Sequence, residues 1–289
     1  MKPFGYLIPK SLARACSLLS EYQERAKVIA GGQSMLPQLK QRLISPEFLI
    51  EIKHLEGLQY VKRGRDGVKI GAMTTHRAIE SSPVIKQKFP MLVEMEMRLA
   101  DSQVRNWGTI GGNLSHADPT GDPAPPLIAL GAKVKATSVR GSREIALESF
   151  FLDFMTTALA DDEILTEISI PYLPPHTAGA YYKETVRPND SAIASAAVVI
   201  GLDGKTGRVT RANIVLGGVG STPIPAEQAA QLLIGKKVNA GLVDQVGAMA
   251  VTEIRPTSDM HTSEEYKRMI AKVVVAQMVN SAAKRALDG

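Results

Sequence analysis

The chain is poor in the residues that mark several common classes of protein. Its one cysteine, Cys16, excludes an internal disulfide and an iron–sulfur cluster held by thiolates of this chain alone. Aromatic residues make up 5% of the sequence and are not interleaved with basic clusters, so no stacking platform for bases is evident. No uncharged apolar run is long enough to cross a bilayer, and the first residues lack the apolar core of a secretory signal. We therefore expect a cytoplasmic protein with no transmembrane segment.

Charge and chemistry-bearing residues exclude further classes. The 34 Lys and Arg residues oppose 29 Asp and Glu, and the net charge of +5 is spread along the chain, which argues against nucleic acid as a partner. The five histidines form no i, i+4 pair and have no cysteine nearby, so we expect no metal site. The sequence has no Ser-His-Asp order, paired carboxylates or Walker-type lysine turn. We therefore expect no catalytic residue for hydrolysis or phosphoryl transfer.

Two glycine pairs carry the strongest positive signal. They lie in the turns Ala30-Gly31-Gly32-Gln33-Ser34 and Thr109-Ile110-Gly111-Gly112-Asn113, each after an apolar run. A Gly-Gly pair can adopt positive φ without a side-chain penalty, so successive N–H groups can form a concave nest for anionic oxygens. Either turn alone is also typical of an ordinary tight turn or a helix C-cap. Together they predict the two halves of one anion cradle, with Ser34 and Asn113 as side-chain donors.

Hydrophobic periodicity predicts an α+β protein of two domains, for which 289 residues and 44% apolar content suffice. Proline-rich residues 171–176 form the expected linker. The first domain is placed at 1–172, with subdomains of about 1–55 and 56–172, and the C-terminal domain at 177–289. Ser11 and Asp122 are the expected helix N-caps. In the first domain, helices are expected at 12–22, 35–40, 75–85, 91–99 and 125–130, and strands of a mixed sheet at 28–30, 49–52, 60–61, 68–70, 133–139, 143–146 and 164–170.

Three segments, taken in order, resemble one family. They are the turn Ala30 to Pro37, the block Val104 to Leu114 and the loop Asp118 to Asp122. The resemblance is to the FAD-binding medium subunit of molybdenum hydroxylases, of the carbon monoxide dehydrogenase medium subunit and xanthine dehydrogenase FAD-domain type. It continues through Glu163-Ile164-Leu165 and Tyr182-Lys183 and covers nearly the whole chain. It implies a two-subdomain PCMH-type FAD-binding domain, followed by a small α+β domain with a three-stranded antiparallel sheet and three helices.

The same resemblance implies roles for particular residues. Both glycine turns contact phosphates and ribityl oxygens, Asp122 accepts from a sugar or ribityl hydroxyl, and Lys183 lies near the flavin ring. Met35 covers one isoalloxazine face and Leu165 packs beside the cofactor, although plain core packing stays open for both. Lys183 could also be a solvated strand charge. The residues implied to bind FAD are Ala30, Gly31, Gly32, Gln33, Ser34, Met35, Thr109, Ile110, Gly111, Gly112, Asn113, Asp122, Leu165 and Lys183.

The function implied by the resemblance is electron relay. FAD is expected to be noncovalent, because Gln33 stands where an attaching histidine would be sought. The molybdenum cofactor and 2Fe–2S clusters would lie on a large and a small partner subunit, in a dimer of heterotrimers. This chain would receive electrons from the clusters and pass them from FAD to an external acceptor such as NAD, a quinone or another carrier. A stand-alone FAD-dependent oxidase or dehydrogenase and a non-catalytic nucleotide-binding module stay open as alternatives.

Overall fold

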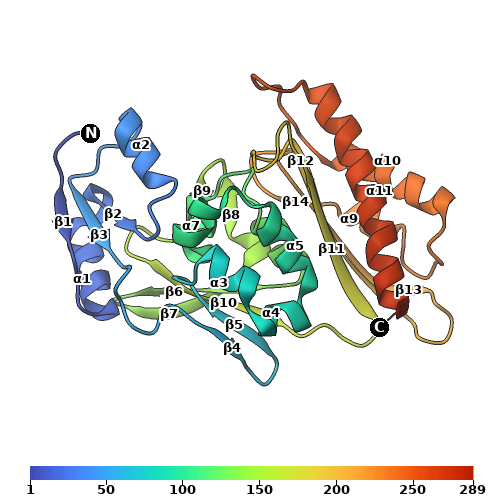
Figure 1. The fold of residues 1–289 in the computed structure, drawn as a ribbon, viewed down its shortest axis with the longest axis horizontal. Coiled ribbons are helices and arrows are strands. Elements are labelled where there is room, and N and C mark those ends of the chain that lie inside the picture. Colours follow the sequence, from blue (N-terminus) through green and yellow to red (C-terminus); the bar gives the residue numbers. More distant parts are fainter. Residues whose placement is uncertain (289) are drawn as a thin grey trace.

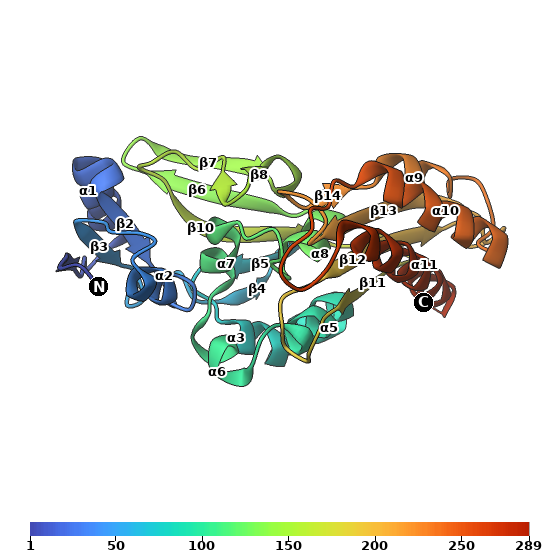
Figure 2. The ribbon, with the colours of Figure 1, turned by 90° about the horizontal axis from the view of Figure 1, so that it is seen from above.

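The structure is a computed structural model that describes residues 1–288. It contains three main sheets in a row, with a parallel three-stranded sheet at one end, an antiparallel five-stranded sheet in the middle and an antiparallel four-stranded sheet at the other end (Figures 1 and 2). The sequence pattern predicted one mixed sheet for the first domain. That prediction is wrong, because the parallel strands and the antiparallel strands form separate sheets.

The parallel sheet has the order β1-β3-β2 and carries the first glycine turn between β2 and α2. Helix α1 begins where expected, with the Ser11 hydroxyl accepting from the Arg14 amide at 3.2 Å. Strand β1 was not anticipated, because its three residues are too few for a period-2 pattern. The elements of this part are β1 (Gly5–Leu7), α1 (Leu12–Tyr22), a 3-10 turn (Gln23–Arg25), β2 (Ala26–Ile29), α2 (Met35–Gln41) and β3 (Phe48–Glu51).

The middle part is the antiparallel sheet β4-β5-β10-β6-β7 with a layer of short helices. Pro83 and Pro90 each stand at the start of a helix, so the expected helix at 75–85 is divided between α3 and α4. Two further helices, α6 and α7, were not predicted. The elements are β4 (Val61–Arg63), β5 (Gly67–Gly71), α3 (His76–Ser81), α4 (Pro83–Lys88), α5 (Pro90–Arg98), α6 (Ser102–Trp107), α7 (Ile110–His116), α8 (Ala124–Ala129), β6 (Lys133–Ser138), β7 (Gly141–Ala146), a 3-10 turn (Leu147–Ser149), β8 (Phe151–Asp153), β9 (Thr156–Thr157) and β10 (Ile164–Pro171).

The C-terminal part is the antiparallel sheet β11-β12-β13-β14 with three helices. The three long strands and the helices agree with the expected α+β layer, and the two-residue β14 adds a fourth strand. The elements are β11 (Thr177–Glu184), β12 (Ala194–Leu202), β13 (Val209–Gly217), β14 (Ile224–Pro225), α9 (Glu227–Gln231), α10 (Ala240–Glu253) and α11 (Glu264–Asp288). No helix within residues 1–288 combines the length and apolarity that a bilayer crossing requires.

Strand β12 joins the two halves of the molecule into one packed body. All nine of its residues are buried. Ala197 and Val199 belong to the apolar core of the middle part, whereas Ala196 and Val198 face the core beneath α10 and α11. A strand buried on both faces reads as a continuous apolar run rather than an alternating one, as β12 does. The C-terminal sheet is therefore held between two helical layers.

Arg285 on α11 reinforces this packing. Its Nη1 donates to the carbonyl oxygen of Gly179 on β11 at 2.8 Å, and its Nη2 lies 2.7 Å from Oε1 of Glu94 on α5. Replacing Arg285 with methionine is expected to lower the free energy of unfolding by about 1–2 kcal/mol, because a charge-assisted bond is lost and a half-exposed ion pair adds little. Urea denaturation measures this. Glu94→Gln is the control for the ion pair, and an unchanged Arg285→Met variant would show that the contact stabilises nothing.

Candidate functional site

The two glycine turns, about 80 residues apart in the sequence, touch each other. A Cβ on Gly31 would overlap the carbonyl oxygen of Trp107 and lie 2.8 Å from its carbonyl carbon. A Cβ on Gly112 would lie 3.5 Å from the Cβ of Ala30. The close approach of these two backbones therefore requires glycine at position 31, and it confirms the prediction that both turns belong to one place.

The first turn has the features of an anion nest. Gly32 has φ +74°, which lets the chain reverse between β2 and α2. Among residues 1–288, no oxygen accepts from the amides of Gly32, Gln33, Ser34 or Met35. Four consecutive free N–H groups on a left-handed bend form a concave donor surface for anionic oxygens. The Ser34 side chain makes no capping bond to α2, so its hydroxyl is a further donor.

The second turn differs from its expected form. It is the first turn of α7, neither Gly111 nor Gly112 has positive φ, and the amides here already have acceptors. The Gly111 amide donates to the Ala72 carbonyl oxygen at 2.9 Å, and the Gly112 amide donates to Oγ1 of Thr109 at 3.2 Å. The prediction of a second backbone nest is therefore wrong, because the helix start and the end of β5 use those amides. This turn offers the Thr109 hydroxyl proton and the Asn113 side chain instead.

Position 111 requires glycine because another backbone packs closely against it, and not because its φ is positive. A Cβ at this position would lie 2.8 Å from the carbonyl oxygen of Ala72, just after β5. Two further backbone bonds hold the same contact, from the Ile110 amide to the Thr74 carbonyl oxygen and from the His76 amide to the Gly108 carbonyl oxygen, each 3.1 Å long. The second turn is thus fixed rigidly on the middle sheet, which positions it against Gly31.

A buried ion pair connects the loop before α8 to the C-terminal sheet. Lys183 Nζ on β11 lies 2.8 Å from Oδ2 of Asp122, and the Tyr181 hydroxyl donates to Oδ1 at 2.7 Å. Lys183 is 4% exposed, so the alternative of a solvated strand charge is wrong. Asp122 does not cap α8, which has Pro123 at that position, because its carboxylate is directed to Lys183 and Tyr181. Burial raises the pKa of Asp122, and the ammonium of Lys183 opposes the rise.

Sequence reasoning missed a second buried pair, His76 and Glu96. The His76 Nδ1 atom lies 3.2 Å and 3.0 Å from the two carboxylate oxygens of Glu96, and both residues are at most 1% exposed. Burial raises the pKa of Glu96, and His76 opposes the rise. The two residues are twenty positions apart on α3 and α5, with no spacing in the sequence that could pair them. Helix α5 also carries Glu94 and Arg98, so nothing in its sequence marks Glu96 as the buried residue.

Met35 and Leu165 lie in apolar surroundings. Leu165 is 4% exposed and belongs to the same core cluster as Ile110 and Leu114 of α7. Met35 is half-buried against the small cluster of Ile29, Leu39 and Leu49. Both placements agree with core packing, and the expected contacts of these two residues with a cofactor stay predictions.

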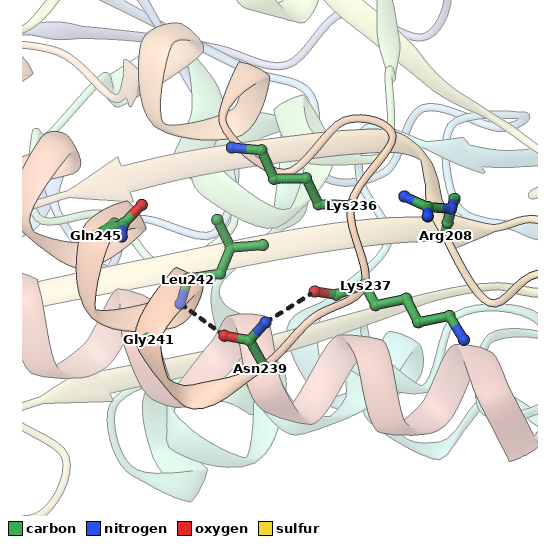
Figure 3. A pocket seen from close by; sticks show the side chains of 7 residues that line it. All are labelled: Arg208, Lys236, Lys237, Asn239, Gly241, Leu242 and Gln245. Carbon is green, nitrogen blue, oxygen red and sulfur yellow. Dashed lines mark hydrogen bonds between the residues drawn. The ribbon is translucent and has the colours of Figure 1, made fainter.

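A cavity of about 440 Å³ lies at the opposite end of the molecule from the first glycine turn. It is lined mainly by basic and amide side chains around the start of α10, where Asn239 accepts from the Leu242 amide (Figure 3). Its cationic groups are Arg208, Lys236 and Lys237, and Figure 3 shows the two lysine chains extending in different directions. The three charges do not converge on one point, so this hollow is not the candidate site. Residues 1–288 contain no cluster of potential metal ligands.

The donors gathered where the two glycine turns meet are typical of proteins that bind an anionic ligand at such a contact. Free amides, hydroxyls and an asparagine side chain fit the oxygens of a diphosphate. Comparison with known proteins makes the class specific. The model of the FAD binding domain in molybdopterin dehydrogenase matches residues 2–173, and that of the CO dehydrogenase flavoprotein C-terminal domain matches residues 180–282. The chain belongs to the FAD-binding medium subunits of molybdenum hydroxylases, as the resemblance in its sequence predicted.

Individual relatives agree with this assignment. The glyceraldehyde dehydrogenase medium chain of Sulfolobus acidocaldarius is 36% identical over 94% of this chain and 95% of its own length. The carbon monoxide dehydrogenase medium chain of Afipia carboxidovorans is 36% identical over 98% of each chain. The solved structure of carbon monoxide dehydrogenase from Hydrogenophaga pseudoflava matches with a TM-score of 0.95 and 35% identity over 99% of both chains. The expected fold, an FAD-binding domain followed by a C-terminal α+β domain, is confirmed, and the chain is an oxidoreductase subunit.

Proposed function

We propose that this chain binds FAD noncovalently and relays electrons in a heteromeric molybdenum hydroxylase. Electrons would arrive from 2Fe–2S clusters on a small subunit, after substrate oxidation at a molybdenum centre on a large subunit, and leave for an external acceptor. NAD, a quinone or another carrier could take this last role. Two relatives are themselves medium chains of dehydrogenases, which supports the subunit arrangement, and a dimer of heterotrimers is the assembly we expect.

The observation that carries the proposal is the contact between the two glycine turns. The amides from Gly32 to Met35 have no acceptor in the part of the protein that the structure describes. They lie beside the second turn because Gly31, which has no Cβ, packs directly against the backbone of Trp107. We call the line of contact between the two glycine turns the seam, and we assign the diphosphate of FAD to it. The donors would be the amides of the first turn and the side chains of Thr109 and Asn113. Bound FAD would supply the exchange between two-electron and one-electron transfer.

The protein's own residues would bind FAD and orient its ring. Asp122 and Lys183 form a buried ion pair, with 2.8 Å between Oδ2 and Nζ, that joins the loop before α8 to β11. The Lys183 ammonium also donates to the carbonyl oxygen of Asp190 at 3.0 Å, which leaves one N–H donor beside the carboxylate acceptor. Such a pair fits a ribityl hydroxyl and the polar edge of a flavin ring. Met35 and Leu165 would pack against apolar parts of the cofactor. We place the domain division at residues 172–177, in the connection between β10 and β11.

Purification with the neighbouring gene products tests the proposal. A yellow chain that contains about one FAD per copy, and that copurifies with iron- and molybdenum-containing subunits, is the expected result. Acid precipitation should release the flavin, since it is noncovalent. A yellow protein that oxidises a small substrate by itself would support an independent oxidase instead. A colourless chain that binds no added FAD would overturn the proposal.

A further inference from the structure

The pair formed by His76 and Glu96 has no role in the function described so far, and it lies directly under the seam between the glycine turns. A Cβ on Gly108 would stand 3.1 Å from His76 Cδ2 and 3.7 Å from Gln33 Cγ. Gly108 immediately precedes the second turn, and Gln33 belongs to the first. The imidazole edge that carries Cδ2 therefore faces the place where the two turns meet.

The two ring nitrogens of His76 have different surroundings. Nδ1 faces the Glu96 carboxylate at 3.0 Å and 3.2 Å. Nε2, which is bonded to Cδ2, has no hydrogen-bond partner within residues 1–288. Within residues 1–288, every side-chain nitrogen or oxygen atom that is fully buried has a hydrogen-bond partner. Because Nε2 has none, it is not fully buried and is accessible to solvent. A side chain that is 1% exposed thus directs its one unpartnered polar atom out of the core, on the side of the seam.

The Glu96 carboxylate determines which hydrogens the imidazole carries. Within residues 1–288, His76 is the hydrogen-bonding partner of Glu96, and no lysine or arginine neutralises that carboxylate. A buried carboxylate without a counter-charge is costly, so the pair costs least to bury when it is neutral as a whole, with one proton between Nδ1 and the carboxylate and one on Nε2. In that state Nε2–H is a donor directed to the seam, and the Glu96 carboxylate holds the ring in this orientation.

We propose that His76, held by Glu96, donates from Nε2 to a diphosphate oxygen of FAD. This inference rests on the proposed function and adds a binding residue to it. The first turn provides neutral amides, whereas His76 provides a donor that can carry charge at the centre of the seam. Glu96 is a positioning residue, because it contacts the imidazole and not the cofactor.

The full chain, freed of flavin, provides the test. Its affinity is titrated with three probes, which are FAD, ADP and riboflavin. If the wild-type chain binds no FAD, the proposed function fails and the inference fails with it. If it does bind FAD, replacing His76 with phenylalanine and Glu96 with leucine together should weaken FAD and ADP binding about 10- to 100-fold, the range of a charge-assisted hydrogen bond. Riboflavin has no diphosphate, so its affinity should stay within about twofold.

The double variant keeps the test independent of folding. His76→Phe alone would leave the Glu96 charge buried and unpaired, whereas replacing both partners with apolar groups is often neutral for stability. Thermal unfolding checks that the double variant is folded. His261→Phe, at an exposed loop position before α11, is the matched control and should leave all three affinities unchanged. Unchanged FAD and ADP affinities in the folded double variant would overturn the inference, as would an equal loss for riboflavin.

Discussion

Replacing Gly31 with alanine is expected to give a protein that has lost most of its FAD, with an affinity at least about 100-fold lower, or about 3 kcal/mol. The added methyl group would overlap the Trp107 carbonyl oxygen and come within 2.8 Å of the carbonyl carbon. Both atoms belong to a backbone fixed to the middle sheet, so the first turn has to move away from the second. Hydrogen-bond donors that come from both turns must stay within roughly 0.5 Å of their positions to bind one ligand, and the displacement caused by the methyl group would be larger. Flavin absorbance per chain, followed by titration of the stripped protein, measures the effect.

A matched glycine separates this effect from the general cost of a methyl group. Gly241 in the first turn of α10 has Asn239 Oδ1 at 3.6 Å from the position of an added Cβ, and its φ is not positive. Gly241→Ala should therefore keep a full complement of FAD and a stability equal to or slightly above that of the wild type. A Gly31→Ala protein that stays yellow at full occupancy would show that the contact between the turns does not position the donors.

Sequence patterns predicted the long elements and the meeting of the glycine turns, but not the local form of the second turn. A Gly-Gly pair is equally compatible with an anion nest and with the first turn of a helix. Here it forms the first turn of α7, because the Thr109 hydroxyl caps that helix by accepting from the Gly112 amide. The close backbone approach of Gly111 to Ala72 depends on a strand about 40 residues earlier. Such contacts are set by tertiary packing, and no local period encodes them.

The buried charges illustrate the same limit. Asp122 precedes a helix at a distance that is typical of an N-cap, yet its carboxylate pairs with Lys183, 61 residues later. His76 and Glu96 lie on different helices whose relative position follows from Pro83 and Pro90. The sequence shows that these residues are titratable, but their burial becomes known only when the packing of the helices is known. Family resemblance named Asp122 and Lys183 without indicating that they pair, and nothing in the sequence indicated the pair of His76 and Glu96.

Replacing Lys183 with methionine is expected to be the most destabilising single change at the site, by about 3 kcal/mol or more near neutral pH. The Nζ atom is lost from a buried carboxylate, which keeps one hydrogen bond, from Tyr181 at 2.7 Å. Burial already raises the pKa of Asp122 in the wild type, and Lys183 is the largest influence that opposes it. Without Lys183 the pKa of Asp122 rises further, and the carboxyl group can escape the penalty by taking up a proton.

The sign of the pH dependence follows from that rise. A carboxyl group whose pKa is higher in the folded protein stabilises the fold most below its unfolded value of about 3.9, and this contribution is lost as pH rises through the folded value. The stability gap between Lys183→Met and the wild type should therefore widen from about pH 5 to pH 8 in urea denaturation. Arg25→Met, at the exposed pair with Glu47 at 3.5 Å, is the control and should cost no more than about 1 kcal/mol. Adding Asp122→Asn to Lys183→Met should remove the pH dependence and recover part of the lost stability, because no charge is then left unpaired. A gap that stays constant with pH would show that the Asp122 carboxylate reaches solvent once Lys183 is gone.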